Sequence, residues 1–278
     1  MQIREFSWKT IDGLTLYSKE WNPENPPKAS VVLIHGLGEH IGRYEHVAAA
    51  MTNAGYILRG FDLRGHGQSE GTRGHADSYD QIALDIDQFI RETRENHPSL
   101  PVFLYGHSLG GALVLFYGET HQGILKGIIA TSPGLAPTNP LSTVKMIAAR
   151  ILSKVAPKSQ LKNDLDLTGL SRDPQVAEKY VADPLVHPLI SARLGLELIN
   201  KGIFIRDHAN QIAVPLLLLQ GTADRLVNPP MTAEFAKLVP QNLITFHTYE
   251  GYYHELHNEP EKEQIIQTMI RWLDAHLA

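Results

Sequence analysis

The stretch VFLYGHSLGGALV, residues 102–114, decides the fold. It begins as a run of strand-forming residues, meets a serine between two glycines, and continues at once as an apolar helical pattern. The pentapeptide GHSLG at 106–110 matches the G-x-S-x-G pattern in the strand–turn–helix setting that this pattern requires. The sequence therefore predicts a sharp turn with Ser108 at its tip.

Such a turn has a chemical use. It lifts the hydroxyl of Ser108 clear of the backbone, and Gly106 and Gly110 remove side chains that would collide there. The following helix N-terminus directs unpaired N–H groups towards the serine. Ser108 is therefore our candidate nucleophile, against the simpler interpretation of a glycine-rich turn with an incidental serine.

Short apolar runs alternate with longer helical patterns along the chain, which indicates an α/β class with a mostly parallel sheet flanked by helices. The segment 13–21 alternates apolar and polar residues, as expected for a strand near the sheet edge. The other expected strands lie at 30–36, 56–62, 102–106, 126–133, 215–221 and 243–251.

About 80 residues before 215–221 contain no strand of comparable quality. Because a structureless loop of this length is uncommon in a compact domain, we predict an inserted helical cap at 137–212, with the core formed by 1–136 and 213–278. Inside the insertion, a helix at about 140–156 carries an apolar stripe. The only charged residues from 137 to 163 are basic: Lys145, Arg150, Lys154, Lys158 and Lys162.

Composition excludes several classes of site. The 278 residues include no cysteine, which removes disulfides, thiolate metal sites and cysteine nucleophiles. The formal net charge of −5 gives no basic footprint for nucleic acid. We expect no metal or cofactor, because His35, His40 and His46 are too widely spaced on a loop to form a convincing ligand set.

The N-terminus and the lengths of the apolar runs bear on where in the cell we expect the protein. The N-terminus has acidic and basic residues early and does not resemble a signal peptide. No apolar run approaches the roughly 20 residues that span a bilayer. We expect a cytoplasmic protein, with peripheral membrane contact left open.

A serine hydroxyl needs a base to take its proton and an acid to orient that base. In this architecture both follow the serine in the chain, each on a loop after a later strand. Asp224 follows the strand at 215–221, and His254 follows the strand at 243–251. We predict a triad of Ser108, Asp224 and His254, with His257 as the other candidate base and, by preference, a neighbour lining the site.

The negative charge that forms on an attacked carbonyl needs two backbone donors. The residue after the nucleophile, Leu109, supplies one. The second is expected from the loop after an early strand, where HGLG at 35–38 lets the N–H of Leu37 face the site.

Five segments of the chain carry a resemblance to a known family: HGLGEHIGRY (35–44), FDLRGHGQSEGTRGH (61–75), GHSLGGAL (106–113), LSRDPQVAEKYVADPLVH (170–187) and YHELHNEPEKE (253–263). Together they resemble the monoacylglycerol lipase and lysophospholipase branch of the α/β-hydrolases. The resemblance spans nearly the whole chain, and the first and fourth segments are the most specific to this branch.

The resemblance implies an α/β-hydrolase fold, the same triad, and Leu37 and Leu109 as oxyanion donors. It also implies that polar groups near the serine hold the glycerol hydroxyls, at the matching positions Glu39, Arg43, His107 and His257. For each of these the alternative is a structural role, such as fixing the loop of Leu37 or supporting the base.

The implied activity is hydrolysis of monoacylglycerols to fatty acid and glycerol through an acyl-enzyme. The alternatives are a general carboxylesterase, a lysophospholipase, or a non-catalytic binding protein, although the last class usually lacks a triad member and none is missing here. The basic apolar helix at 140–156 suits either transient contact with a lipid surface or ordinary packing. We expect the packed arrangement, with the apolar stripe facing the protein.

Overall fold

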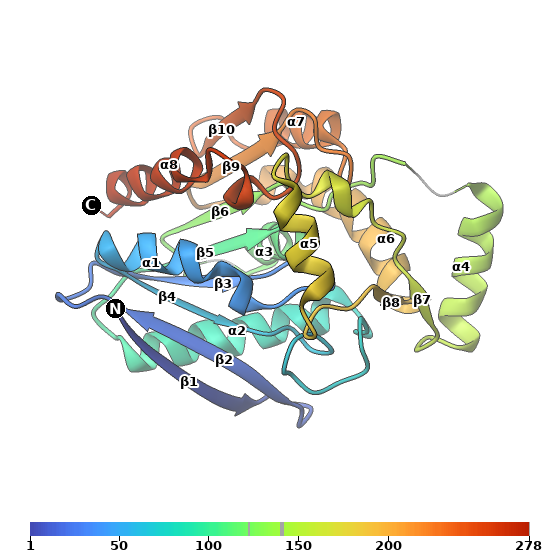
Figure 1. Cartoon of the computed structure of the whole chain (residues 1–278), viewed down its shortest axis with the longest axis horizontal. Coiled ribbons are helices and arrows are strands. Elements are labelled where there is room, and N and C mark those ends of the chain that lie inside the picture. Colours follow the sequence, from blue (N-terminus) through green and yellow to red (C-terminus); the bar gives the residue numbers. More distant parts are fainter. Residues whose placement is uncertain (122, 140–141, 278) are drawn as a thin grey trace.

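The computed structural model describes residues 1–121, 123–139 and 142–277 (Figure 1). Residues 140–141 of the predicted cap helix, and the side chain of Lys145, lie outside this description. No helix among the described residues is long and apolar enough to cross a membrane.

A mostly parallel sheet of eight strands forms the centre of the molecule, in the order β1-β2-β4-β3-β5-β6-β9-β10. The pairs β1–β2 and β2–β4 are antiparallel, so β2 runs against the other strands of this sheet. The strands are β1 (Gln2–Lys9), β2 (Thr15–Asn22), β3 (Ala29–Ile34), β4 (Tyr56–Phe61), β5 (Val102–His107), β6 (Gly127–Thr131), β9 (Leu216–Gly221) and β10 (Ile244–Tyr249).

The predicted α/β-hydrolase fold is confirmed, with one strand missed. The strand predicted near the sheet edge, at 13–21, is β2, and the edge itself is the missed strand β1, which pairs along its whole length with β2. Its sequence QIREFSWK is mostly exposed, and charged residues interrupt its apolar ones. It therefore lacks the apolar run that reveals the buried strands.

Helices cover both faces of the sheet and bury two apolar cores. One face is covered by α1 (Glu45–Asn53) and α8 (Lys262–Ala275). The other is covered by α2 (Tyr79–Asn96), α3 (Leu109–Thr120) and α7 (Pro229–Leu238), together with part of the insertion. Strand β5 lies near the middle between β3 and β6, so α3 starts at the centre of the sheet's carboxyl edge.

The insertion between β6 and β9 is helical for most of its length, and it also contains a two-stranded antiparallel sheet. That sheet pairs two exposed or half-buried segments of three residues, too short for a sequence pattern to reveal. The elements are α4 (Thr143–Val155), β7 (Gln160–Lys162), η2 (Leu167–Gly169), α5 (Pro174–Ala182), β8 (Leu189–Ser191), α6 (Ala192–His208) and η3 (Ala209–Gln211).

Helix α4 stands at the end of the molecule, apart from the sheet, and packs against α6 (Figure 1). Its apolar stripe faces outwards: Val144 is 77% exposed, Ile147 52%, Ile151 59% and Val155 74%. The expectation that this stripe faces the protein was therefore wrong. Helical periodicity identifies an apolar face, but it does not say what that face meets.

Candidate active site

The turn at Ser108 has the predicted geometry. Ser108 follows β5 and is the N-cap of α3, with φ 54° and ψ −116°. A side-chain carbon at Gly106 would lie 2.2 Å from the carbonyl oxygen of Gly110, and one at Gly110 would lie 2.0 Å from the carbonyl oxygen of Ile34. Both positions therefore require glycine, because the helix starts in contact with β3 and β5.

The structure brings Ser108, His254 and Asp224 into one hydrogen-bonded chain. His254 Nε2 lies 2.9 Å from Ser108 Oγ, and His254 Nδ1 lies 2.8 Å from Asp224 Oδ2. Asp224 Oδ1 accepts hydrogen bonds from the backbone N–H groups of Leu226 and Val227, at 2.8 and 3.1 Å. The carboxylate is thus fixed in the orientation that holds a proton on Nδ1 and leaves Nε2 free to accept one from the serine.

The electrostatics of the pair favour a basic imidazole. Burial acts to lower the pKa of His254, but the charge and hydrogen bond of Asp224, with Glu255 and Glu39 further away, outweigh it and raise that pKa. For Asp224, burial acts to raise the pKa, while His254 and the two backbone donors bring it below its usual value. The site therefore stabilises an imidazolium next to a carboxylate, which is the state that follows proton transfer from the serine.

The predicted oxyanion donors lie on two fixed loops. Gly36 N–H donates to Glu39 Oε1 at 2.6 Å, and the carbonyl of Gly38 accepts from His187 N at 3.0 Å, so the loop of Leu37 is held on both sides. Within the described residues, the N–H groups of Leu37 and Leu109 donate to no protein group. Both are therefore available to a ligand.

Glu39 and Arg43 are both bound to other protein groups. Arg43 makes two hydrogen bonds to Glu255, each of 2.8 Å, and one of 2.5 Å to Glu39. Its guanidinium lies 4.8 Å from the ring centre of Tyr180 in the insertion. Tyr44 donates to Glu39 at 2.8 Å. These contacts fit the structural alternative, and contact with glycerol stays a prediction.

Glu255 is the residue that the sequence analysis missed. Its side chain is buried, and the charge of Arg43, acting against the desolvation by burial, lowers its pKa to about 2. The two partners are 212 positions apart in the chain, so no local pattern could reveal the pair. The only available signal was an acidic residue directly after His254.

His107 and His257 form an aromatic support behind the base. The ring of His107 lies 4.8 Å from that of His254 and 4.7 Å from that of His257, which also stacks on Tyr44 at 4.7 Å. Burial lowers the pKa of His107 to about 3 and places the pKa of His257 well below its usual value. Both imidazoles are therefore neutral near pH 7. Their predicted contact with the headgroup stays untested.

Two segments of the insertion reach the site loops. Backbone N–H groups of His254 and Glu255 donate to the carbonyls of Gly169 and Leu170, at 3.2 and 2.7 Å. On the other side, the ring of His40 meets Asp183 at 2.8 Å. The insertion is thus hydrogen-bonded both to the loop of the base and to the loop of Leu37.

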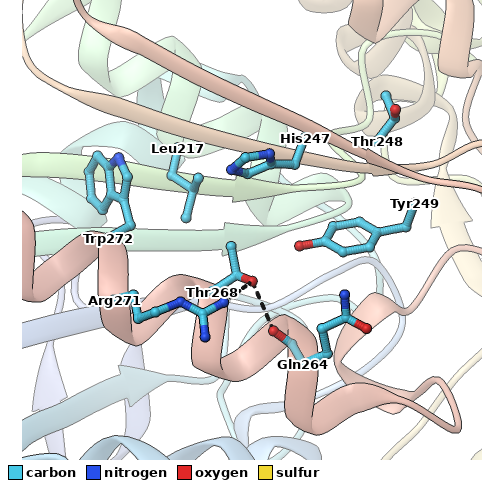
Figure 2. Close-up of a pocket in the computed structure, with 8 residues that line it drawn as sticks. All are labelled: Leu217, His247, Thr248, Tyr249, Gln264, Thr268, Arg271 and Trp272. Carbon is cyan, nitrogen blue, oxygen red and sulfur yellow. Dashed lines mark hydrogen bonds between the residues drawn. The ribbon is translucent and has the colours of Figure 1, made fainter.

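One hollow of the structure lies away from this site. It is an open groove of about 480 Å³ between β10 and α8, lined by His247 and Tyr249 from the strand and by Arg271 and Thr268 from the helix (Figure 2). None of its lining residues belongs to the site. Among the described residues, no group of three or more histidine, aspartate or glutamate side chains is placed to hold a metal ion.

Comparison with known proteins agrees with this geometry. The family model described as serine aminopeptidase, S33, matches residues 25–261. The monoacylglycerol lipase of Mycolicibacterium smegmatis is 33% identical and is covered over 98% of both chains. The human monoglyceride lipase is 36% identical over 89% of this chain and 82% of its own.

Solved structures give the same result. The crystal structure of the Paleococcus ferrophilus monoacylglycerol lipase is 35% identical, covers 94% of this chain and 99% of its own, and superposes with a TM-score of 0.87. The family match, the fold and the hydrogen bond of Ser108 all indicate the same class of enzyme. The chain belongs to the serine aminopeptidase S33 family of the α/β-hydrolases and is a serine hydrolase of the branch that contains the monoacylglycerol lipases.

Proposed function

We propose that this protein hydrolyses monoacylglycerols, with Ser108 as nucleophile, His254 as general base and acid, and Asp224 as the group that orients the imidazole. The observation that carries the proposal is the chain Asp224–His254–Ser108 beside two unpaired backbone N–H groups. The full-length similarity to named monoacylglycerol lipases supports the choice of substrate.

The reaction proceeds in two steps. Ser108 Oγ attacks the ester carbonyl while His254 Nε2 takes the hydroxyl proton, and the N–H groups of Leu37 and Leu109 receive the negative charge on the carbonyl oxygen. The imidazolium then gives its proton to the leaving glycerol oxygen, which breaks the ester bond and leaves an acyl-serine. Water, deprotonated by the same imidazole, releases the fatty acid.

We further propose that residues 137–212 act as a cap over the acyl chain, attached to the core residues 1–136 and 213–278. The hydrogen bonds from the N–H groups of His254 and Glu255 to the carbonyls of Gly169 and Leu170 support a cap whose inner part is fixed to the site. An ester would then meet a site that is already assembled.

The test is a panel of initial rates on monoacylglycerols of several chain lengths, di- and triacylglycerol, a lysophospholipid, p-nitrophenyl butyrate and an aminoacyl anilide. We expect preference for monoacylglycerols and complete loss of turnover in Ser108→Ala, with Tm unchanged. Fast turnover of the short ester alone would make the protein a general esterase. Substantial activity in pure Ser108→Ala would remove the mechanism.

We also propose that α4 contacts lipid surfaces. Its four exposed aliphatic side chains, Val144, Ile147, Ile151 and Val155, form one stripe, and Arg150 is exposed on the same helix. An apolar stripe with basic flanks inserts into the headgroup region of a bilayer and is attracted by anionic lipid. Burying one such side chain contributes up to about 1.5–3 kcal/mol.

Vesicle co-sedimentation tests this second proposal. We expect binding to anionic vesicles that falls in Ile147→Ser/Ile151→Ser, with unchanged hydrolysis of p-nitrophenyl butyrate. Val181→Ser is the matched control, because Val181 is 70% exposed but lies on α5. If the double variant and the control bind vesicles equally, α4 is not the contact surface.

A further inference from the structure

Two adjacent residues at the end of β6 touch both halves of the reacting pair. The carbonyl of Thr131 accepts from the backbone N–H of Ser108 at 3.0 Å. The next residue, Ser132, donates from Oγ to the backbone carbonyl of His254 at 2.7 Å. The main chains of Ser108 and His254, whose side chains meet at 2.9 Å, are therefore both hydrogen-bonded to one dipeptide at the end of a strand of the central sheet.

Ser132 holds this place in a backbone conformation that serine rarely adopts. Its φ is 42°, in the left-handed region, and its side chain is fully buried. Its N–H donates to the carbonyl of Leu219 at 2.8 Å, which extends the contact between β6 and β9 by one residue. Glycine would adopt this φ without cost, whereas serine adopts it with strain. The side chain is therefore present although the local backbone favours glycine.

Strained backbone of this kind is rare in the molecule. Among the described residues, positive φ outside glycine occurs at Ser108, Ser132 and Asp164. Two of these three belong to the site, and the third, Asp164, is exposed in the insertion. Backbone strain that gathers at a site points to a functional constraint on the side chain that it presents.

We propose that Ser132 is a positioning residue for His254: its hydroxyl fixes the main chain of the base so that the imidazole meets Ser108 and Asp224 together. The proposal rests on the roles proposed above for Ser108 and His254. It goes beyond them, because the hydroxyl of Ser132 bonds the backbone carbonyl of His254, whereas the two ring nitrogens of His254 bond Asp224 and Ser108. Displacement of a reacting group by about 1 Å lowers rates by up to about 100-fold. A single contact to the main chain of His254 can therefore affect the rate strongly.

Ser132→Gly separates positioning from folding. The variant loses the hydroxyl and, at the same time, relieves the left-handed backbone, so we expect a Tm within a few degrees of wild type. We expect kcat to fall about tenfold or more with KM nearly unchanged. Ser132→Ala should lose activity similarly but with a lower Tm, because it keeps the strained backbone.

Two further measurements make the test specific. Asp164→Gly is the matched control: it relieves the same kind of strain away from the site, and its kcat should equal that of wild type. NMR titration of the His254 ring gives a readout that a merely structural role would not move. In Ser132→Gly we expect its midpoint to shift down, because a displaced ring loses part of its hydrogen bond to Asp224.

The outcomes are distinguishable. A kcat within about twofold of wild type in Ser132→Gly, with an unchanged His254 titration, overturns the positioning role. If wild-type protein hydrolyses no ester on the panel, the proposed function fails, and the titration alone then decides whether Ser132 positions the ring.

Discussion

At the scale of single residues, the imidazole of His254 shows how the site reverses the usual effect of burial. A buried imidazole that is not bonded to a carboxylate loses its proton more easily, as His107 does with a pKa of about 3. His254 lies 4.8 Å away, ring to ring, and its pKa is raised. The two pKa values differ because Asp224 forms a hydrogen bond to the imidazole of His254 and not to that of His107.

This difference predicts the pH dependence. The neutral form of His254 is the base, so kcat/KM should rise with pH as the proton leaves, with a midpoint above the ordinary value of about 6.5. Asp224→Asn removes the charge that raises the pKa, so its midpoint should fall and its rate should drop about 10³–10⁴-fold. Rates measured from pH 5 to 9 on a soluble ester check both. A flat wild-type profile, with acylation rate-limiting, would contradict His254 as base.

How far the sequence leads at this scale depends on the kind of signal. The hydrogen-bonded arrangement of Ser108, His254 and Asp224 was predictable because strand ends bring these residues to one edge of the sheet. Glu255 and Ser132 were not, since their partners, Arg43 and the carbonyl of His254, are 212 and 122 positions away. Such contacts follow from how two loops meet, and no periodicity records that.

At the scale of elements, one buried arginine joins two loops of the site. Arg43 follows β3 and binds Glu39, which holds the N–H of Gly36 beside the predicted oxyanion donor. The same guanidinium binds Glu255, which follows His254. Donor loop and base loop are thus fixed to each other through charges that burial makes costly to separate.

Removing that arginine should destabilise the protein strongly. Arg43→Met leaves two buried carboxylates without their cation, which costs about 3–5 kcal/mol of unfolding free energy. Adding Glu255→Gln should recover part of the loss. Urea unfolding of the single and double variants measures the coupling. The control is Arg91→Met, because Arg91 is 63% exposed and the loss of its pair with Asp87 should cost under about 1 kcal/mol. Equal losses in Arg43→Met and the control would refute the argument.

The sequence patterns predicted where helices and strands lie better than they predicted what those helices and strands contact. The helical repeat that includes Val144 and Val155 indicated a cap helix, and α4 is there. The side to which the apolar stripe of α4 faces depends on α6. That helix packs against the opposite side of α4 and leaves the stripe in solvent. The edge strand β1 was missed for a related reason: its mostly exposed residues depend on pairing with β2 rather than on burial.

At the scale of the whole molecule, stability and activity make different demands on buried charge. The site keeps its buried carboxylates ionised by pairing them with Arg43 and His254. Glu119, on α3, is buried to 3% exposure, and neither of its oxygens has a hydrogen-bond partner among the described residues. Burial alone raises its pKa to about 9. It is therefore a carboxyl group that the fold keeps protonated.

Glu119 should make the folded protein less stable as pH rises. Between its ordinary value of 4.5 and about 9, the unfolded chain has released a proton that the folded protein still holds. The unfolding free energy then falls by up to about 1.4 kcal/mol per pH unit across that window. The side chain in Glu119→Gln is neutral at every pH. The unfolding free energy of this variant should therefore exceed that of wild type by an amount that is near zero at pH 4.5 and grows towards pH 9.

Urea unfolding at pH 5, 7 and 8.5 measures this difference, with Glu178→Gln, an exposed position on α5, as control. The control should follow wild type at each pH. Ester hydrolysis at pH 7 should be unchanged in both variants, because Glu119 lies towards the far end of α3 from Ser108. A pH-independent difference between Glu119→Gln and wild type would mean that this carboxyl is ionised in the folded state, with a partner that stabilises its charge.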